Sequence, residues 1–150
     1  MAELKFAPRE IFEVILEWSV MACFDLILEY RGGVIMVRRK IAPYKNVWAL
    51  PGLRMYKPEG INDALKRIAY QELGLKINPE NAKLHAQYVG KFKTEKDRQD
   101  LSTCYIVKVD DKQEITLNSE HFSTFQIANS IPSQTGAMYR YYLQKYWDNK

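Results

Sequence analysis

The stretch WALPGLRMYKPEGINDALKRIAYQELGL, from Trp48 to Leu75, decides how this chain folds. A Pro-Gly turn follows a short apolar stretch, expected to be a strand, and leads into a polar loop that reaches Glu59. Beyond that loop, apolar residues recur at helical spacing: Ile61, Ala64, Leu65 and Ile68. This pattern predicts an amphipathic helix. We expect it to end at Gly74, because glycine tolerates the left-handed conformation that follows a last helical turn.

The segments on either side of this stretch alternate between helix and strand patterns. We expect helices over residues 8–18 and about 135–147, and strands over residues 20–30, 34–39, 83–92 and 102–109. The turn Arg31-Gly32-Gly33 joins the first two strands as a hairpin, and the last helix is expected to bury Met138, Tyr142 and Tyr146. This order predicts an α/β protein with a mixed sheet between helices, as one domain over residues 1–150.

Composition and charge exclude several classes of function. The excess of 22 Lys and Arg over 18 Asp and Glu is mild and forms no basic run, so we expect no nucleic-acid partner and favour small anions. The segment from Lys93 to Asp100, KTEKDRQD, is mixed in sign and predicts a solvated loop. Acidic residues interrupt the apolar stretch from Ile11 to Tyr30, which argues against a membrane partner. Cys23 and Cys104 lie in apolar runs, predicting free buried thiols and a cytoplasmic location.

The Trp48–Leu75 stretch resembles the Nudix box, whose consensus is G-x5-E-x7-R-E-U-x-E-E-x-G-U with U aliphatic. With Leu53 as the first position, the matching residues are Glu59, Arg67, Glu72, Gly74 and Leu75. Leu53 replaces the consensus glycine, and Ile68 and Gln71 replace two helix glutamates. The resemblance implies the Nudix fold and a hydrolase, with Glu59 and Arg67 as a structural ion pair between loop and helix.

The resemblance also implies a divalent cation, Mg2+ or alternatively Mn2+, bound near Glu72. Mg2+ is typically held by one or two carboxylates together with waters and substrate phosphates. Because Ile68 and Gln71 leave the helix only one of its carboxylates, we expect Glu120 and the backbone carbonyl of Leu53 as further ligands. Leu53 is the weak point of this site, since glycine often serves such positions through a positive φ that a branched residue adopts only with strain.

The losses from the box are similar to those in the GDP-mannose mannosyl hydrolases, one branch of the Nudix superfamily. The resemblance covers roughly residues 5–127. Besides the thinned box, the positions that carry it are Asp25 in an apolar first strand, Arg39 after the second strand, Arg54 and Lys57 around the Pro-Gly turn, and the pair Glu120-His121.

This resemblance implies a role for each residue. His121 is expected to be the general base, because imidazole titrates near neutral pH. Arg39 and Arg54 are expected to contact phosphate oxygens, with Arg39 assisting catalysis and Arg54 and Lys57 binding substrate. Asp25 is a candidate catalytic residue that is expected to orient the sugar or pair with an arginine, with a purely structural role as the alternative. His85 has no comparable context and stays unassigned.

Three functions remain open from the sequence. The first is Mg2+-dependent hydrolysis of a nucleotide sugar resembling GDP-mannose, releasing free sugar and a nucleoside diphosphate. The second is the commoner Nudix attack at phosphorus, splitting a nucleoside di- or triphosphate derivative. The third is a nucleotide-binding protein with weak or lost turnover. The branch resemblance further implies a homodimer, and Tyr44, Trp48 and Tyr88 are candidates for stacking on a base.

Overall fold

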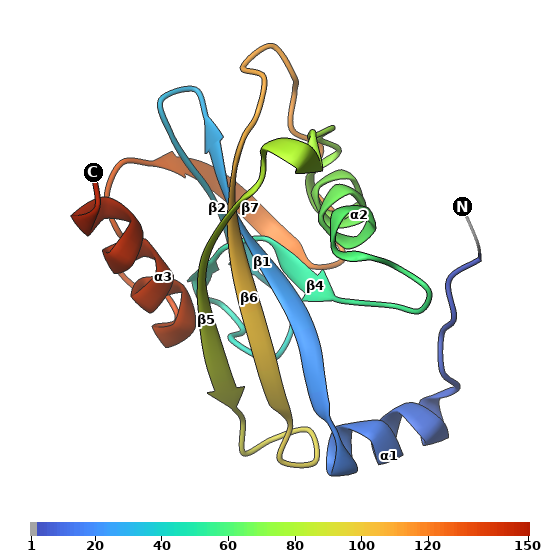
Figure 1. Ribbon diagram of the computed structural model, residues 1–150. Coiled ribbons are helices and arrows are strands. Elements are labelled where there is room, and N and C mark those ends of the chain that lie inside the picture. Colours follow the sequence, from blue (N-terminus) through green and yellow to red (C-terminus); the bar gives the residue numbers. More distant parts are fainter. Residues whose placement is uncertain (1–2) are drawn as a thin grey trace.

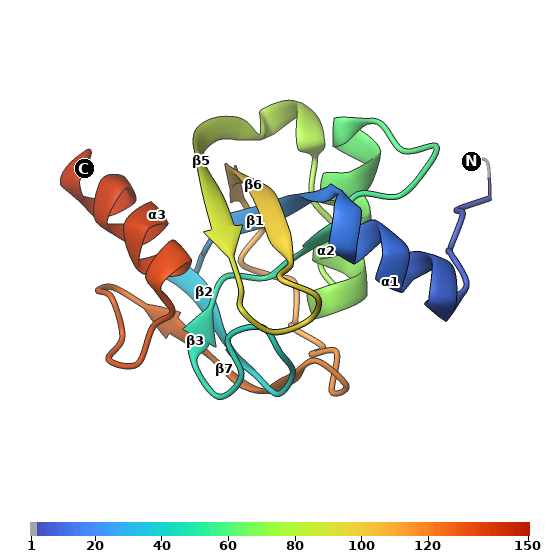
Figure 2. The same cartoon turned by 90° about the horizontal axis from the view of Figure 1, so that it is seen from below.

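A mixed sheet with helices against both faces forms the body of the protein, as seen in a computed structural model that describes residues 3–150 (Figure 1). Along the chain the elements are α1 (Arg9–Trp18), β1 (Val20–Tyr30), β2 (Gly33–Arg39), β3 (Trp48–Ala49), β4 (Gly52–Arg54), α2 (Ile61–Leu73), the 3-10 turn η1 (Pro79–Asn81), β5 (Lys83–Lys91), β6 (Gln99–Lys108), β7 (Phe122–Ala128) and α3 (Ala137–Asp148). Helices α2 and α3 lie on opposite sides of the sheet, which confirms the predicted α/β architecture (Figures 1 and 2).

Strand β1 is the centre of the sheet, whose main path runs β3-β2-β1-β6-β5. It runs parallel to β6 over its length and pairs with β2 only beside the turn, at Glu29 and Tyr30. Further from the turn, β4 takes the place of β2, with Gly52 opposite Asp25. The beginning of the Nudix-like stretch is therefore a strand of the sheet, held directly beside a buried residue of β1.

Most elements lie where the sequence predicts them. Helix α2 ends at Gly74, which has φ +67°, and α3 buries Met138, Tyr142 and Tyr146. The short apolar strand expected before the Pro-Gly turn is β3, whereas β4 and the later strand β7 were not predicted. A strand of three residues such as β4 carries too few side chains to show alternation.

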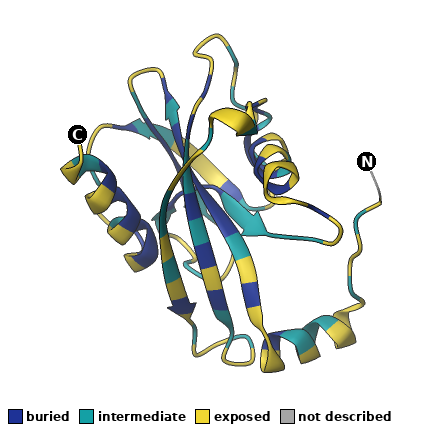
Figure 3. Cartoon of the chain, in the orientation of Figure 1, coloured by how far each residue is buried: buried dark blue, intermediate teal, exposed yellow. Residues whose placement is uncertain are grey.

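Burial follows the layers of the fold, with the core between the sheet and one face each of α2 and α3 (Figure 3). Helix α1 differs: Ile11, Val14 and Trp18 are 51%, 55% and 79% exposed. Both cysteines are free, Cys104 buried and Cys23 half-buried. No helix within residues 3–150 is long and apolar enough to cross a membrane.

Candidate functional site

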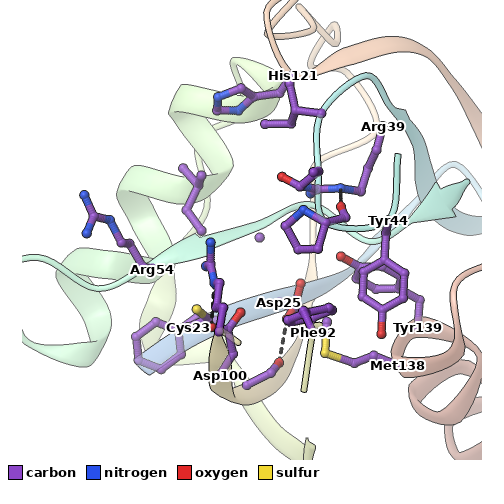
Figure 4. Close-up of a pocket in the computed structure, with 18 of the residues that line it drawn as sticks. Cys23, Asp25, Arg39, Tyr44, Arg54, Phe92, Asp100, His121, Met138 and Tyr139 are labelled. Carbon is purple, nitrogen blue, oxygen red and sulfur yellow. Dashed lines mark hydrogen bonds and ion pairs between the residues drawn. The ribbon is translucent and has the colours of Figure 1, made fainter. Parts of the chain in front are cut away.

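A cavity of about 410 Å3 lies over β1 and β4 and collects most of the residues singled out in the sequence (Figure 4). Its walls come from separate parts of the chain: β1, the loop after β2, β4, the β5–β6 hairpin, the segment before β7, and α3. The expected site residues that line it are Asp25, Arg39, Leu53, Arg54 and His121. The fold therefore brings residues nearly a hundred positions apart into one concave site.

The predicted ion pair between Glu59 and Arg67 is confirmed, and it anchors the polar loop to α2. Arg67 donates from Nε and Nη2 to the two carboxylate oxygens of Glu59, at 2.6 and 2.9 Å, and from Nη2 to the carbonyl of Arg54 at 2.8 Å. The Arg54 guanidinium in turn lies over the rings of Phe12 and Tyr56, with centroids at 4.2 and 4.7 Å. This column of stacked and hydrogen-bonded groups holds Arg54 at the cavity wall.

His121 is held by Glu72, the one carboxylate left at the helix glutamate positions of the box. Nδ1 of His121 lies 2.9 Å from both oxygens of Glu72, whose side chain is fully buried. Asn118 donates more weakly to the same carboxylate, at 3.4 Å. The hydrogen bond to Glu72 raises the pKa of His121, while partial burial opposes it. A carboxylate that fixes one ring nitrogen of a histidine is the arrangement that orients a general base.

The expected metal ligands are less well assembled. Glu120 is exposed, and its backbone N–H donates to Asn118 Oδ1. Within residues 3–150, its carboxylate makes no hydrogen bond or ion pair. Leu53 is not among the described residues with positive φ, so its side chain causes no backbone strain there. Over the same described range, no group of three His, Cys, Asp or Glu side chains is arranged to hold a metal. These donors do not form a preassembled metal site.

The two expected substrate contacts Arg39 and Lys57 differ in their position relative to the cavity. Arg39 lines the cavity, and its guanidinium donates to the carbonyls of Pro43 and Ala42 at 2.6 and 3.4 Å, which braces the loop after β2. Lys57 is exposed, and the described cavity lining does not include it. The structure therefore brings Arg39, but not Lys57, to the site.

Asp25 lies on the cavity floor and is 4% exposed. Ser102 donates to its Oδ2 at 2.5 Å, and the Tyr142 hydroxyl donates to Ser102 at 2.8 Å. Burial raises the pKa of Asp25 to about 7, although the Ser102 hydrogen bond and the charge of Arg39 pull it down. A Cβ at Gly52 would collide with Asp25 Oδ1, so the glycine of the Pro-Gly turn is required by close approach.

The sequence prediction was wrong for the end of the 93–100 segment. Arg98 lines the cavity with a side chain only 16% exposed, and Asp100 is buried at the start of β6. The reason is local: Glu95, Lys96 and Asp97 all have positive φ, and this tight turn reverses the chain so that Arg98 and Asp100 follow directly on the paired strand. The signal that was available is strand alternation, since Arg98, Asp100 and the inward-facing Ser102 are two residues apart.

The aromatic residues considered for stacking on a base, and His85, differ in whether they line the cavity. Tyr44 lines the cavity, whereas Tyr88 packs against Tyr141 and Trp48 lies beneath the Arg38 guanidinium. The ring of His85 bonds through Nε2 to the backbone carbonyl of Tyr142, at 2.9 Å. Of these groups, only Tyr44 is available to a molecule in the cavity.

Comparison with known proteins identifies related sequences and folds. A family profile described as the NUDIX domain matches residues 21–131. The Low-salt glycan biosynthesis protein Agl8 of Haloferax volcanii is 28% identical over 123 residues, covering 76% of this chain and 74% of Agl8.

Two solved structures share the fold at low sequence identity. The MutT NUDIX hydrolase from Burkholderia pseudomallei superposes with a TM-score of 0.75 at 18% identity, covering 85% of this chain and 98% of that one. The NUDIX domain of Shewanella oneidensis NrtR, crystallised with ADP ribose, gives 0.69 at 12% identity and covers 95% and 93%.

A third structure was crystallised with a metal ion. The bifunctional NMN adenylyltransferase/ADP ribose pyrophosphatase from Francisella tularensis, complexed with AMP and a Mn ion, gives a TM-score of 0.56 at 21% identity. It covers 77% of this chain and 35% of that one.

Proposed function

We propose that this chain, which belongs to the NUDIX domain family, is a nucleotide-sugar hydrolase. Its substrate would resemble GDP-mannose, and its products would be free sugar and nucleoside diphosphate. One observation carries the proposal: His121, oriented by the buried Glu72, lines the same cavity as Arg39 and Asp25. A base, a cation and a carboxylate in one cavity match the needs of water attack on a sugar carbon with an anionic leaving group.

In the proposed reaction, His121 accepts a proton from water as the water oxygen bonds to C1 of the sugar. The bond from C1 to the diphosphate oxygen breaks, and its electron pair leaves with the nucleoside diphosphate. Arg39 and Arg54 stabilise the negative charge of that leaving group through guanidinium contacts with phosphate oxygens. Asp25 accepts a hydrogen bond from a sugar hydroxyl, and its burial keeps this contact free of competing water.

We also propose that turnover depends on a divalent cation, Mg2+ or Mn2+. Because the protein donors are not preassembled, such an ion would be held chiefly by the diphosphate itself, with Glu72, Glu120 and the Leu53 carbonyl as the candidate protein ligands. Its chemistry there is charge neutralisation on the leaving group. Titration of turnover with Mg2+ and with Mn2+ after chelation tests this dependence, and full activity in excess chelator would contradict it.

A second candidate function is nucleotide binding with weak or no turnover. The observation that favours it is that Glu72 is already engaged by His121, on a helix where Ile68 is buried in the core and Gln71 contacts Arg67. With one carboxylate left at the glutamate positions of the box, and that one occupied, the helix is poorly suited to activating water beside phosphorus. The occupied carboxylate also disfavours the commoner Nudix reaction relative to attack at carbon.

Product analysis separates these functions. The protein is incubated with Mg2+ and GDP-mannose, GDP-glucose and a panel of nucleotides, and products are resolved by phosphorus NMR and sugar chromatography. Free sugar with GDP is the expected result, and GMP with sugar phosphate would instead indicate attack at phosphorus. Absence of any product together with retained nucleotide binding would favour the second candidate.

We further propose that the protein is a homodimer. The exposed apolar residues Ile11, Val14 and Trp18 of α1 support this proposal, because apolar side chains grouped on a short helix are stabilised by a partner surface. Light scattering coupled to size exclusion tests it directly. A mass near 17.6 kDa at micromolar concentration would contradict it.

A further inference from the structure

The base of the β5–β6 hairpin forms part of the cavity, although no residue there carries a role in the proposed reaction. Phe92 and Arg98 close the hairpin loop, with the Phe92 N–H donating to the Arg98 carbonyl at 2.9 Å. Both side chains line the cavity, and so does Asp100 two residues later. The hairpin therefore presents a ring, a guanidinium and a carboxylate to whatever occupies the site.

The guanidinium and the carboxylate are only partly used by the protein. Arg98 donates from Nε to Asp100 Oδ1 at 2.8 Å and from Nη1 to Glu95 at 3.4 Å. Among residues 3–150, no bond is recorded for Arg98 Nη2 or for Asp100 Oδ2. No fully buried side-chain nitrogen or oxygen in this described range lacks a partner, so both atoms keep some solvent exposure, and both side chains line the cavity. A free donor thus stands beside a free acceptor.

Asp25 adds a second acceptor to the same floor. Ser102 occupies its Oδ2, whereas Oδ1 has no recorded partner within the described residues and lies over Gly52. Asp25 and Ser102 come from the paired strands β1 and β6, and Asp100 stands two residues before Ser102 on β6. The acceptors on Asp25 and Asp100 therefore lie along one strip of the cavity floor (Figure 4), and Arg98 is bonded to Asp100 at its end.

The charges of this strip select the kind of group that fits it. Arg98 is paired with Asp100 and Glu95, so its charge is already neutralised, and a further anion would be repelled by the carboxylates. A hydroxyl both donates and accepts a hydrogen bond, so it satisfies Arg98 Nη2 and Asp100 Oδ2 together. Phe92 and Tyr139, each packed against Tyr44 at 5.5 and 5.1 Å between centroids, supply an apolar wall for the ring carbons.

We propose that Arg98 and Asp100 bind hydroxyl groups of the sugar ring and determine which sugar the cavity accepts. The inference rests on the proposed function, because it presumes that the occupant carries a sugar beyond its diphosphate. It assigns the hairpin end of the cavity to the sugar, and the arginines Arg39 and Arg54 to the diphosphate. The hairpin residues would then contribute to binding of the nucleotide sugar but not of the nucleoside diphosphate alone.

Calorimetry on matched pairs of compounds tests this assignment. Each pair is a nucleotide sugar and its own nucleoside diphosphate: GDP-mannose or GDP-glucose with GDP, and UDP-glucose with UDP. Titrations use the His121→Ala variant, so that the sugar is not released during the measurement. The measured quantity is the Kd of the nucleoside diphosphate divided by the Kd of its nucleotide sugar. The change of this ratio between variants isolates the contribution of the sugar.

Arg98→Ala and Asp100→Asn, each added to this background, should lower the ratio about tenfold, because each removes a hydrogen bond to a charged group. The Kd for the nucleoside diphosphate should change less than about twofold. Lys93→Ala, an exposed change in the same loop, is the matched control. Arg98→Lys keeps a charge beside the buried Asp100 while losing the planar fork, so it tests binding without leaving that carboxylate unpaired.

The outcomes of the two proposals are distinguishable. An unchanged ratio in both Arg98→Lys and Asp100→Asn, with unaltered melting temperatures, overturns the sugar assignment. Release of free sugar by the unmodified protein is a separate measurement, and its failure would contradict the proposed reaction alone. A ratio that falls in the hairpin variants supports the inference whether or not turnover occurs.

Discussion

Two glutamates of the same motif bury their carboxylates completely but are bound by different partners. Glu59 receives two donors from Arg67 and the backbone N–H of Tyr56. Glu72 is bound by Nδ1 of His121 and, more weakly, by Asn118. Arginine remains protonated at any physiological pH, so Glu59 has a permanent counterion, whereas the charge of histidine depends on its surroundings.

This difference distinguishes a glutamate that stabilises the fold from a glutamate that supports a candidate catalytic residue, within one stretch of sequence. Every donor around Glu59 also holds the loop or β4 in place, since Arg67 bonds to the Arg54 carbonyl as well. The partner of Glu72 instead lines the cavity and lies 49 positions further along the chain. A buried carboxylate paired with a titratable group at a cavity wall is a candidate for function, and one paired with arginine inside a loop is a candidate for stability.

The largest expected effect is on turnover. His121→Ala should reduce kcat by about 10²- to 10⁴-fold, the usual contribution of a positioned general base. His85→Ala is the matched control, because that histidine bonds to a backbone carbonyl and does not line the cavity. Steady-state release of free sugar measures both. Equal, small losses in the two variants would remove His121 from the mechanism and leave its contact with Glu72 structural.

The second effect is on stability. Glu59→Ala should lower the free energy of unfolding by about 3–5 kcal/mol, because it strands a largely buried arginine without its counterion. Urea unfolding followed by tryptophan fluorescence measures the loss. The double change Glu59→Met with Arg67→Met should recover part of it, and Glu10→Ala, exposed on α1, is the neutral control. A loss below about 1 kcal/mol would show that Glu59 is not part of the architecture.

The sequence predicted the surroundings of Glu59 far better than the pairing of Glu72 with a residue of the cavity. The box has a fixed spacing, so the loop, α2, its end at Gly74 and the Glu59–Arg67 pair follow from residues close together. The pairing of Glu72 with His121 joins positions 49 apart, and only the sheet brings them together. Local pattern carries no information on such distances.

Arg98 and Asp100 show the same limit of local sequence pattern, here for burial instead of pairing. Their segment is strongly charged, and a charged segment is solvated in most proteins. Its end lies in the cavity because three consecutive positive φ values reverse the chain, and residues such as Glu95 and Lys96 give no glycine signal for that turn. Composition therefore predicted exposure where backbone geometry dictated burial.

The third prediction concerns pH. The pKa of Asp25 is raised from an ordinary value near 3.8 to about 7, so between these values the folded state holds a proton that the unfolded chain has lost. Its contribution to stability is complete below about pH 4 and is lost as pH rises through 7, at up to about 1.4 kcal/mol per pH unit. Asp25→Asn should flatten this slope and raise the melting temperature at pH 8 relative to the parent.

The same substitution should act oppositely on function. Asparagine keeps the shape of the side chain and an acceptor for Ser102, but it carries no charge. Binding of a sugar hydroxyl should weaken, seen as a higher KM for the nucleotide sugar, while the protein becomes more stable above pH 7. Ser123→Ala, at an exposed residue of β7, is the control for both readouts. A parallel loss of stability and activity would mean that Asp25 is structural.

The smallest expected effect is at Leu53, where the box consensus has glycine. Leu53 lies in β4 opposite Phe24, without positive φ, and its side chain packs against the core. Leu53→Gly should therefore destabilise the protein by about 1–2 kcal/mol, from lost packing and from the greater backbone freedom of glycine in the unfolded chain. Leu53→Ala separates these contributions, since only the backbone part, about 0.5–1 kcal/mol, distinguishes it from the glycine variant. If kcat changes by less than about twofold, Leu53 stabilises the fold, as Glu59 does, and does not limit turnover. A gain in stability or turnover from glycine would instead mean that the lost box residue still limits the site.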